Sequence, residues 1–356
     1  MRLRAWFAQA VGAILLAILL TGCGDKKPLL SESYVFGTRV EVQVAEDLPE
    51  AQSRAAIAQV LAEFDRLHRS YHAWQPSELT QLNEALAAGR ASRVSVEMAA
   101  LLLETQTYAR QSDGLFDPGI GRLIDLWGFH ADSYAEHVPD AAAIKAWLKT
   151  HPSIMQLQIE QDAEGARVSS TNRQVALDFG GSLKGTALDR AAAILKAAGV
   201  RNALINIGGN VMALGSRYGH AWRVAIQAPR AAGPLAIIEL FDGEATGTSG
   251  DYQRYFEVDG QRYPHLLDPR TGYPASGTQA VTIVVSGRDA GVRSDVLTKP
   301  VFVAGEAAWQ MMADRLGLVQ VLRVDAEGKV VVSAALANRL KFMPHDGKLP
   351  DIRRIE

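Results

Sequence analysis

The stretch from Thr246 to Pro274 constrains most tightly how this chain can fold. It places Asp259-Gly260 between two runs rich in aromatic residues. Asp-Gly is the strongest short signal of a β-hairpin, because both central residues of a type I′ turn need a positive φ. The returning strand leads to His265 and then to a polar turn at Asp268-Pro269-Arg270. We expect a hairpin whose rim gathers protonatable groups and an anion-binding arginine, although an ordinary surface hairpin would show the same pattern.

The N-terminus has the pattern of a bacterial lipoprotein. Arg2 and Arg4 precede an apolar run from Val11 to Leu20, which is too short to span a membrane and is followed by Cys23. Residues 1–23 are therefore predicted to be a signal peptide with a lipobox that lipidates Cys23, residues 24–33 a short tether, and residues 34–356 the folded domain. This places the protein on the periplasmic side of a bacterial membrane, with the inner membrane favoured. An uncleaved anchor helix is the alternative.

Composition excludes several classes of protein. Cys23 is the single cysteine, so neither an intrachain disulfide nor a cysteine-based metal site can form. A net charge of -2 argues against a nucleic-acid-binding surface. Strand-like and helix-like segments alternate without a clean linker, which favours one compact α/β unit.

A second informative stretch runs from Leu177 to Asp189. The end of a strand enters a turn containing Gly180 and Gly181 and opens a helix with Lys184 near its start. Free backbone N–H groups at a helix start, together with a lysine, can bind phosphate. The spacing matches neither a P-loop nor a dinucleotide-binding fingerprint, and a tight connection would also use glycines.

Eight motifs taken together resemble one family. In chain order they are Tyr34-Val35-Phe36-Gly37-Thr38, Ser77-Glu78-Leu79 with Asn83, Gly114-Leu115-Phe116-Asp117-Pro118, Leu126-Trp127-Gly128-Phe129, Asp178-Phe179-Gly180-Gly181 with Lys184-Gly185, Asn206-Ile207-Gly208-Gly209, Thr248-Ser249-Gly250-Asp251-Tyr252 and His265 through Gly272. This order resembles the ApbE-type FAD:protein FMN transferases over roughly residues 34–305. The resemblance implies a T-fold, an α/β (α+β) architecture with a twisted, mostly antiparallel sheet and packed helices.

The same resemblance implies an activity. Such enzymes bind FAD with Mg²⁺ and transfer its FMN half to a threonine of a partner protein, releasing AMP. The partner is typically a subunit of a membrane redox complex. Two other functions use the same residues: a Mg²⁺-dependent FAD pyrophosphatase, and a periplasmic flavin-binding lipoprotein without catalysis.

Candidate site residues come from residue chemistry and from the resemblance. From their chemistry, His265 and Asp251 are the expected catalytic residues, with His265 orienting phosphate or assisting removal of the acceptor's proton; the alternative for His265 is a structural histidine bonded to its own turn. The resemblance implies the Gly181 carbonyl and Asp295 as metal ligands. Thr298 is expected to join them, because residues three apart on a helix point to the same face. The resemblance implies FAD contacts by Phe36, where the family usually has methionine, and by Trp74 or a neighbour in residues 71–74. It further implies contacts by Leu115, Phe116, Asp117, Asp178, Lys184 and Leu267.

One position departs from the family pattern. Four residues after Asp295 the family usually has a threonine, but this chain has Lys299. An ammonium group has no lone pair and cannot bind Mg²⁺. We therefore expect Lys299 to point toward the phosphates or to form an ion pair with Asp295, at some cost to Mg²⁺ affinity.

Overall fold

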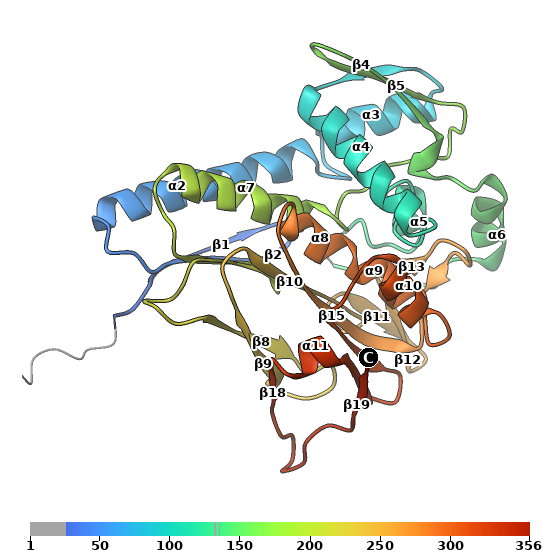
Figure 1. The fold of residues 1–356 in the computed structure, drawn as a ribbon. Coiled ribbons are helices and arrows are strands. Elements are labelled where there is room, and N and C mark those ends of the chain that lie inside the picture. Colours follow the sequence, from blue (N-terminus) through green and yellow to red (C-terminus); the bar gives the residue numbers. More distant parts are fainter. Residues whose placement is uncertain (1–25, 132, 135) are drawn as a thin grey trace, which may run out of the picture.

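A computed structural model describes residues 26–131, 133–134 and 136–356 (Figure 1). The predicted signal peptide, including Cys23, and the first residues of the predicted tether lie outside this part of the chain. Within it, no helix combines the length and the apolar character needed to cross a bilayer.

The fold is organised around a nine-stranded sheet with the order β1-β2-β6-β7-β10-β15-β16-β17-β19. Neighbouring strands are antiparallel except β17 and β19, which run parallel. The predicted mostly antiparallel sheet is therefore confirmed. The strands of this sheet are β1 (Leu29–Val35), β2 (Thr38–Val44), β6 (Ala203–Ile207), β7 (Asn210–Leu214), β10 (Glu244–Gly250), β15 (Thr278–Ser286), β16 (Val321–Asp325), β17 (Val330–Ser333) and β19 (Ile352–Ile355).

The first strand begins inside the segment predicted as a tether. Leu29 pairs with Val44, so β2 finds a hydrogen-bonding partner along its whole length. Most of the β1 side chains are exposed or half-buried. An edge strand of this kind lacks the alternation of apolar and polar residues from which a strand is recognised in a sequence.

Helices cover one face of the sheet, as Figure 1 shows for α2, α7 and α8. The longest of these three, α2, buries Ile57, Val60, Phe64 and Leu67. The helices are α2 (Glu50–Ser70), α3 (Glu78–Ala87), α4 (Val96–Gln111), α5 (Gly121–Leu126), α6 (Ala141–Thr150), α7 (Leu183–Ala197), α8 (Ala290–Val296), α9 (Thr298–Val303), α10 (Trp309–Arg315) and α11 (Ala334–Ala337), with one 3-10 turn, η1 (Ile154–Gln156).

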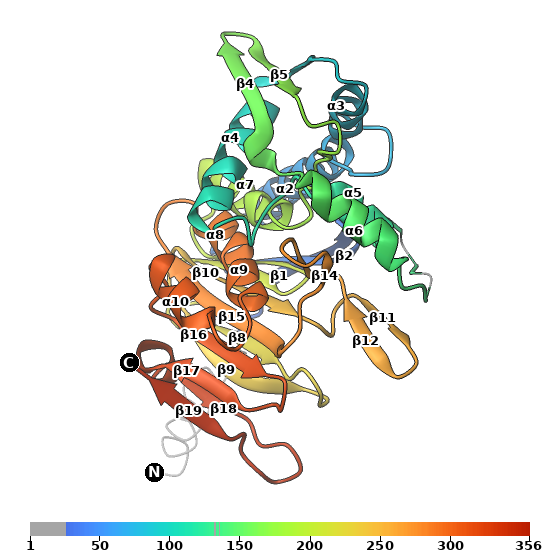
Figure 2. The same ribbon diagram turned by 90° about the vertical axis from the view of Figure 1, so that its right-hand side faces the viewer.

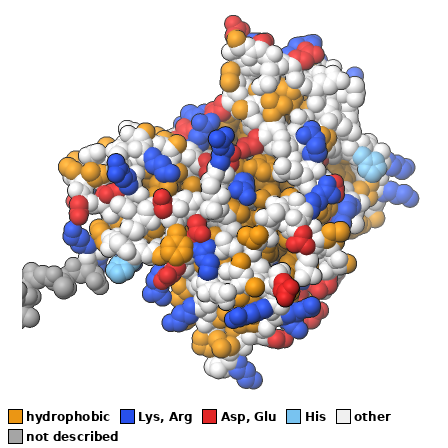
Figure 3. All heavy atoms as spheres, in the orientation of Figure 1, with side chains coloured by type: hydrophobic (Ala, Val, Ile, Leu, Met, Phe, Trp, Pro, Cys, Tyr) orange, Lys and Arg blue, Asp and Glu red, His pale blue; other side chains and the backbone are white. Residues whose placement is uncertain are grey.

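Smaller sheets complete the fold. A three-stranded sheet with the order β18-β9-β8 lies against the other face of the large sheet, and a second one, β3-β5-β4, packs with α3 and α4 (Figures 1 and 2). Their strands are β8 (Trp222–Gln227), β9 (Pro234–Leu240), β18 (Leu340–Phe342), β3 (Ser92–Val94), β4 (Leu157–Asp162) and β5 (Gly165–Ser170). On the face drawn in Figure 3, positive and negative side chains are interspersed rather than gathered into one basic patch.

The predicted hairpin is confirmed. It consists of β11 (Tyr255–Val258) and β12 (Gln261–Pro264), and it projects from the body of the molecule in Figure 2. Asp259 and Gly260 both have a positive φ, 51° and 76°. A short pair of strands, β13 (Leu267–Asp268) and β14 (Tyr273–Pro274), follows and closes the polar turn.

Candidate functional site

Asp295 lies in α8 where this helix packs closely against α7 and β10. A Cβ atom on Gly185 would lie 2.5 Å from the Gly291 carbonyl oxygen, and one on Gly247 would lie 2.1 Å from that of Ser294. Only glycine permits this spacing. The Gly185 N–H donates to Asp295 Oδ2 at 2.9 Å. The first turn of α7 therefore holds a buried carboxylate, in addition to any phosphate that it binds.

Lys299 forms the expected ion pair with Asp295. Its Nζ lies 2.6 Å from Asp295 Oδ1 and 2.7 Å from the backbone oxygen of the same residue. Burial alone would raise the pKa of Asp295, but the positive charges of Lys299 and Lys184 hold that pKa below its ordinary value. The carboxylate is thus ionised and already neutralised by an ammonium group.

Thr298 and Gly181, the other two predicted metal ligands, lie close to this pair. Thr298 Oγ1 donates to the Asp295 backbone oxygen at 2.8 Å and shares a hydrogen bond with Ser249 Oγ, also at 2.8 Å. A Cβ atom on Gly181 would lie 3.3 Å from Cε of Lys299. The structure therefore brings the predicted ligands together, with the Lys299 side chain among them.

As arranged, these residues do not fit Mg²⁺. A magnesium ion needs oxygen atoms about 2 Å away in near-octahedral geometry. Asp295 Oδ1 accepts from Lys299, Oδ2 accepts from Gly185, and the Thr298 hydroxyl is bonded to Asp295 and Ser249. In the described part of the chain, no group of three or more His, Cys, Asp or Glu residues is placed to hold a metal.

Two further cations lie near this pair. Lys184 occupies the first turn of α7, and burial lowers its pKa, opposed by the charge of Asp295 and reinforced by the charges of Lys299 and Arg254. Arg254 is held by the Tyr134 hydroxyl and by the Phe129 backbone oxygen. Since like charges repel at close range, three neighbouring cations favour a bound anion that carries more than one negative charge.

His265 faces the same cations. Its Nδ1 and its backbone N both lie 3.0 Å from the Arg254 carbonyl oxygen. A carbonyl can only accept, so Nδ1 carries the proton and Nε2 has the free lone pair. Burial and the charges of Arg254, Lys184 and Lys299 lower the pKa of His265 to about 3, so the ring is neutral at neutral pH. The placement suits proton removal, and the catalytic role of His265 stays a prediction.

Asp178, His130 and Trp74 form the second half of the site. His130 Nε2 donates to Asp178 Oδ2 at 2.8 Å, and Trp74 stacks on the His130 ring with centroids 5.1 Å apart and planes at 22°. Burial alone would raise the pKa of Asp178, but the hydrogen bond and charge of His130, and the charge of Arg254, lower it. Trp74 remains 39% exposed, which leaves aromatic surface for a flat ligand.

Phe36 begins a row of rings that ends at His130. It sits in the turn between β1 and β2 with φ 57°, and its ring meets the edge of His68 at 5.7 Å. His68 contacts His72 at 4.9 Å, and His72 contacts Trp74 at 4.5 Å. The aromatic row thus links two predicted FAD contacts that are far apart in sequence.

Other predicted FAD contacts have structural partners. Asp117 Oδ1 accepts from the backbone N–H groups of Gly119 at 2.7 Å and Ile154 at 2.9 Å, and burial raises the pKa of this carboxyl group. Leu115 and Leu267 are buried in the hydrophobic core. Phe116 is also buried, but a Cβ on Gly181 would lie 3.2 Å from its ring. Phe116 and the Lys299 side chain therefore both lie against Gly181. FAD contacts by all four residues stay predictions.

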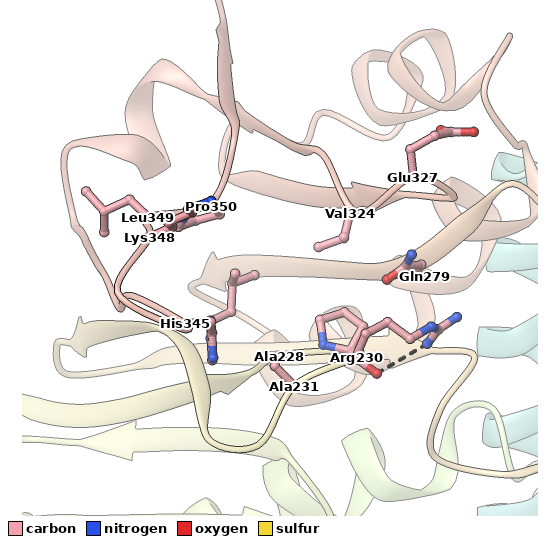
Figure 4. A pocket seen from close by; sticks show the side chains of 13 residues that line it. Ala228, Arg230, Ala231, Gln279, Val324, Glu327, His345, Lys348, Leu349 and Pro350 are labelled. Carbon is pink, nitrogen blue, oxygen red and sulfur yellow. Dashed lines mark hydrogen bonds between the residues drawn. The ribbon is translucent and has the colours of Figure 1, made fainter.

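Asp251 forms an ion pair outside the cluster of Lys184, Lys299 and Arg254. Its two carboxylate oxygens bind the Arg230 guanidinium at 2.8 and 2.6 Å. Arg230 lines a cavity of about 360 Å³ together with Gln279 and Lys348 (Figure 4). A catalytic role for Asp251 stays a prediction, and it would require the carboxylate to exchange Arg230 for another partner.

Two residues of the site were not predicted from the sequence, His130 and Arg254. His130 directly follows Trp127-Gly128-Phe129, a motif noted for its aromatic residues. Its partner Asp178 lies 48 positions away, so spacing could not reveal the pair. Arg254 belongs to a run interpreted as a strand, but it lies in a bend just before β11.

Comparisons with known proteins identify a family. The family model described as "ApbE family" matches residues 36–322. A Rhodobacter capsulatus protein named FAD:protein FMN transferase is 41% identical over 88% of this chain, although the chain spans only 59% of that relative's length. A Haemophilus influenzae protein of the same name is 26% identical, covering 91% of this chain and 95% of the relative.

Solved structures show the same similarity. The ApbE protein of Thermotoga maritima has a TM-score of 0.80 and 30% identity, covering 88% of this chain and 99% of the other. The flavinyl transferase ApbE of Pseudomonas stutzeri, in its apo form, has a TM-score of 0.75 and 29% identity, covering 89% and 98%.

Proposed function

Because this chain belongs to the ApbE family, we propose that it transfers the FMN half of FAD to a threonine hydroxyl of a partner protein and releases AMP. The observation that carries the proposal is the cluster of Lys184, Lys299 and Arg254 beside the aromatic surface of Trp74. Asp178 joins the two halves, since it bonds His130 and lies close enough to Arg254 for that charge to lower its pKa. FAD has the matching parts, a doubly charged diphosphate and flat ring systems.

The reaction is a phosphoryl-group exchange. The threonine oxygen forms a bond to the phosphorus of the FMN half, and the bond between that phosphorus and the bridging oxygen breaks. AMP leaves with the bonding electron pair, and the hydroxyl proton passes to a base. Negative charge grows on the bridging and terminal oxygens, where Lys184, Lys299 and Arg254 stabilise it.

His265 is the proposed base. Its Nε2 lone pair can take the threonine proton, and its Nδ1 bond to Arg254 fixes the ring and the tautomer. The cations that lower its pKa are the ones that the diphosphate would neutralise. Binding of FAD should therefore raise the pKa of His265 and make the ring a better proton acceptor when the substrate is present.

Mg²⁺ is the part of the family's chemistry from which this chain departs. The resemblance implies Gly181 and Asp295 as its ligands, and helix spacing adds Thr298, but Lys299 already neutralises Asp295. The steps above are therefore assigned to the chain's own cations. The metal-ligand role of these three residues stays a prediction for metal titration to test.

The location and the acceptor extend the proposal. We propose a protein anchored through a lipid on Cys23 to the periplasmic side of a bacterial membrane, with the inner membrane favoured. There it would meet a threonine acceptor in a membrane redox complex. The support is the N-terminal lipobox pattern together with the family resemblance.

Product analysis tests the proposed function. The full chain is incubated with FAD and a protein carrying a candidate acceptor threonine, and the products are separated by mass spectrometry and chromatography. We expect AMP and acceptor protein heavier by one FMN, in equal amounts. AMP with free FMN would instead identify a pyrophosphatase, and unchanged FAD would identify a flavin carrier.

A further inference from the structure

Lys299 stands where the family pattern has a threonine, and its ammonium group lies on the oxygen atoms that a metal would use. Nζ contacts Asp295 Oδ1 at 2.6 Å and the Asp295 backbone oxygen at 2.7 Å. The other carboxylate oxygen, Oδ2, accepts from the Gly185 N–H at 2.9 Å. Each carboxylate oxygen of Asp295 thus has a donor supplied by the chain itself.

The lysine is built into the site. Its side chain is 15% exposed, and that of Asp295 is 1% exposed. The Lys299 stem passes Gly181 so closely that a Cβ atom there would lie 3.3 Å from Cε and 3.4 Å from Cδ. Moving the ammonium away would leave a buried carboxylate without its partner, which is strongly unfavourable. A metal would therefore have to replace an interaction that the fold already makes.

The ammonium group has a third N–H for a substrate. Two of its three donors are directed to Asp295, and no other partner of Nζ occurs among residues 26–131, 133–134 and 136–356. Lys184, whose charge acts on the same carboxylate, makes no hydrogen bond or ion pair within the same ranges. With Arg254 nearby, the cations outnumber the carboxylates Asp178 and Asp295.

We propose that the Lys299 ammonium replaces the divalent cation at this site, so that the chain binds the diphosphate of FAD without a bound metal. This inference rests on the proposed use of FAD, and it concerns how the diphosphate is held. The third N–H of Lys299 donates to a diphosphate oxygen, and Lys184 supplies a second positive charge. Asp295 acts as a positioning residue that fixes Lys299 and keeps it charged.

The test is FAD affinity with and without metal. FAD binding to the full chain in detergent is followed by flavin fluorescence, once in EDTA and once in excess Mg²⁺. We expect the two dissociation constants to agree within about threefold, because the metal has no place in the wild-type site. Affinity present only with Mg²⁺ would overturn the inference while leaving the transferase proposal intact. No FAD binding in either buffer would overturn both.

Lys299→Thr restores the residue that the family uses and opens Asp295 Oδ1. This variant should lose about tenfold or more in FAD affinity in EDTA and regain it with Mg²⁺. Lys299→Met removes the charge without offering a ligand, so it should bind FAD weakly in both buffers. A Lys299→Thr variant that keeps wild-type affinity in EDTA contradicts the inference.

Metal binding to the wild-type chain tests the same inference without depending on whether the Lys299 variants fold. Mn²⁺ is titrated into the wild-type chain saturated with FAD and followed by electron paramagnetic resonance. We expect only weak binding by the exposed phosphates. One tightly bound Mn²⁺ per chain that Asp295→Asn abolishes would show that a metal displaces Lys299, and the inference would be wrong.

Discussion

Lys184→Met should weaken FAD binding without weakening the fold. The ammonium of Lys184 has no hydrogen-bond partner in the described part of the chain, and Asp295 keeps Lys299 and Gly185 when the charge is removed. The substitution therefore leaves no protein group unpaired. Burial lowers the pKa of Lys184, which means that the fold disfavours its charged form. The free energy of unfolding should stay level or rise.

The expected loss is that of one charge-assisted contact to a diphosphate. Such a contact contributes about 1.5–3 kcal/mol, which corresponds to a loss in affinity of about 10- to 150-fold. FAD titrations at several salt concentrations measure this loss, and the variant should also depend less on salt. Lys196→Met is the matched control, because Lys196 is an exposed lysine near the other end of the same helix, α7. Equal FAD affinity in Lys184→Met and Lys196→Met would refute the assignment of the diphosphate to this cluster.

Five further predictions follow, four from the structure and the last from the N-terminal sequence pattern. The pKa of His265 falls from 6.5 to about 3 on folding, so the unfolding free energy should drop as pH falls below 6.5. Urea titrations of the wild type should show this drop between pH 7 and pH 5, and in His265→Gln the drop should be smaller by about 2 kcal/mol. An equal drop in both proteins would contradict a buried neutral ring. His265→Gln should also slow FMN transfer while leaving FAD bound, and a parental rate would exclude it as the base. Trp74→Ala should weaken the free energy of FAD binding by about 0.5–1.5 kcal/mol in a fluorescence titration. Unchanged affinity would show that the ligand lies elsewhere. A Cβ on Gly185 would lie 2.5 Å from the Gly291 oxygen, so Gly185→Ala should lower the unfolding free energy by about 1–3 kcal/mol, and wild-type stability would show that α7 and α8 are not packed as described. Cys23→Ser should move the protein from the membrane to the soluble fraction of cells, and retention in the membrane would favour an uncleaved anchor helix.

Local features of the fold could be predicted from the sequence. The Asp259-Gly260 turn has one common solution, and both residues adopt the positive φ that it requires. Ser95 accepts from the Met98 N–H at 3.1 Å, as an N-cap serine should. The ion pair between Asp295 and Lys299 also follows from spacing, since residues four apart on a helix are neighbours. In each case the decisive contacts lie within a few residues.

Long-range contacts could not be predicted in this way. Asp178 forms a hydrogen bond with His130, 48 positions away. The carboxylate of Asp117 accepts a hydrogen bond from the backbone N–H of Ile154, 37 positions away. Asp251 is bound by Arg230, which the sequence did not single out. The family resemblance supplied candidate residues, but it could not say which carboxylates face a ligand and which already have partners in the protein.

A crystal structure of the chain with FAD, prepared in EDTA, tests the central claim most directly. The account predicts the diphosphate within hydrogen-bonding distance of Lys184 and Lys299, a flat ring system against Trp74, and His265 Nε2 facing the phosphorus of the FMN half. It would be contradicted by a diphosphate bound in the cavity beside Arg230 and Lys348, or by one that enters the site only when a metal ion has displaced Lys299 from Asp295.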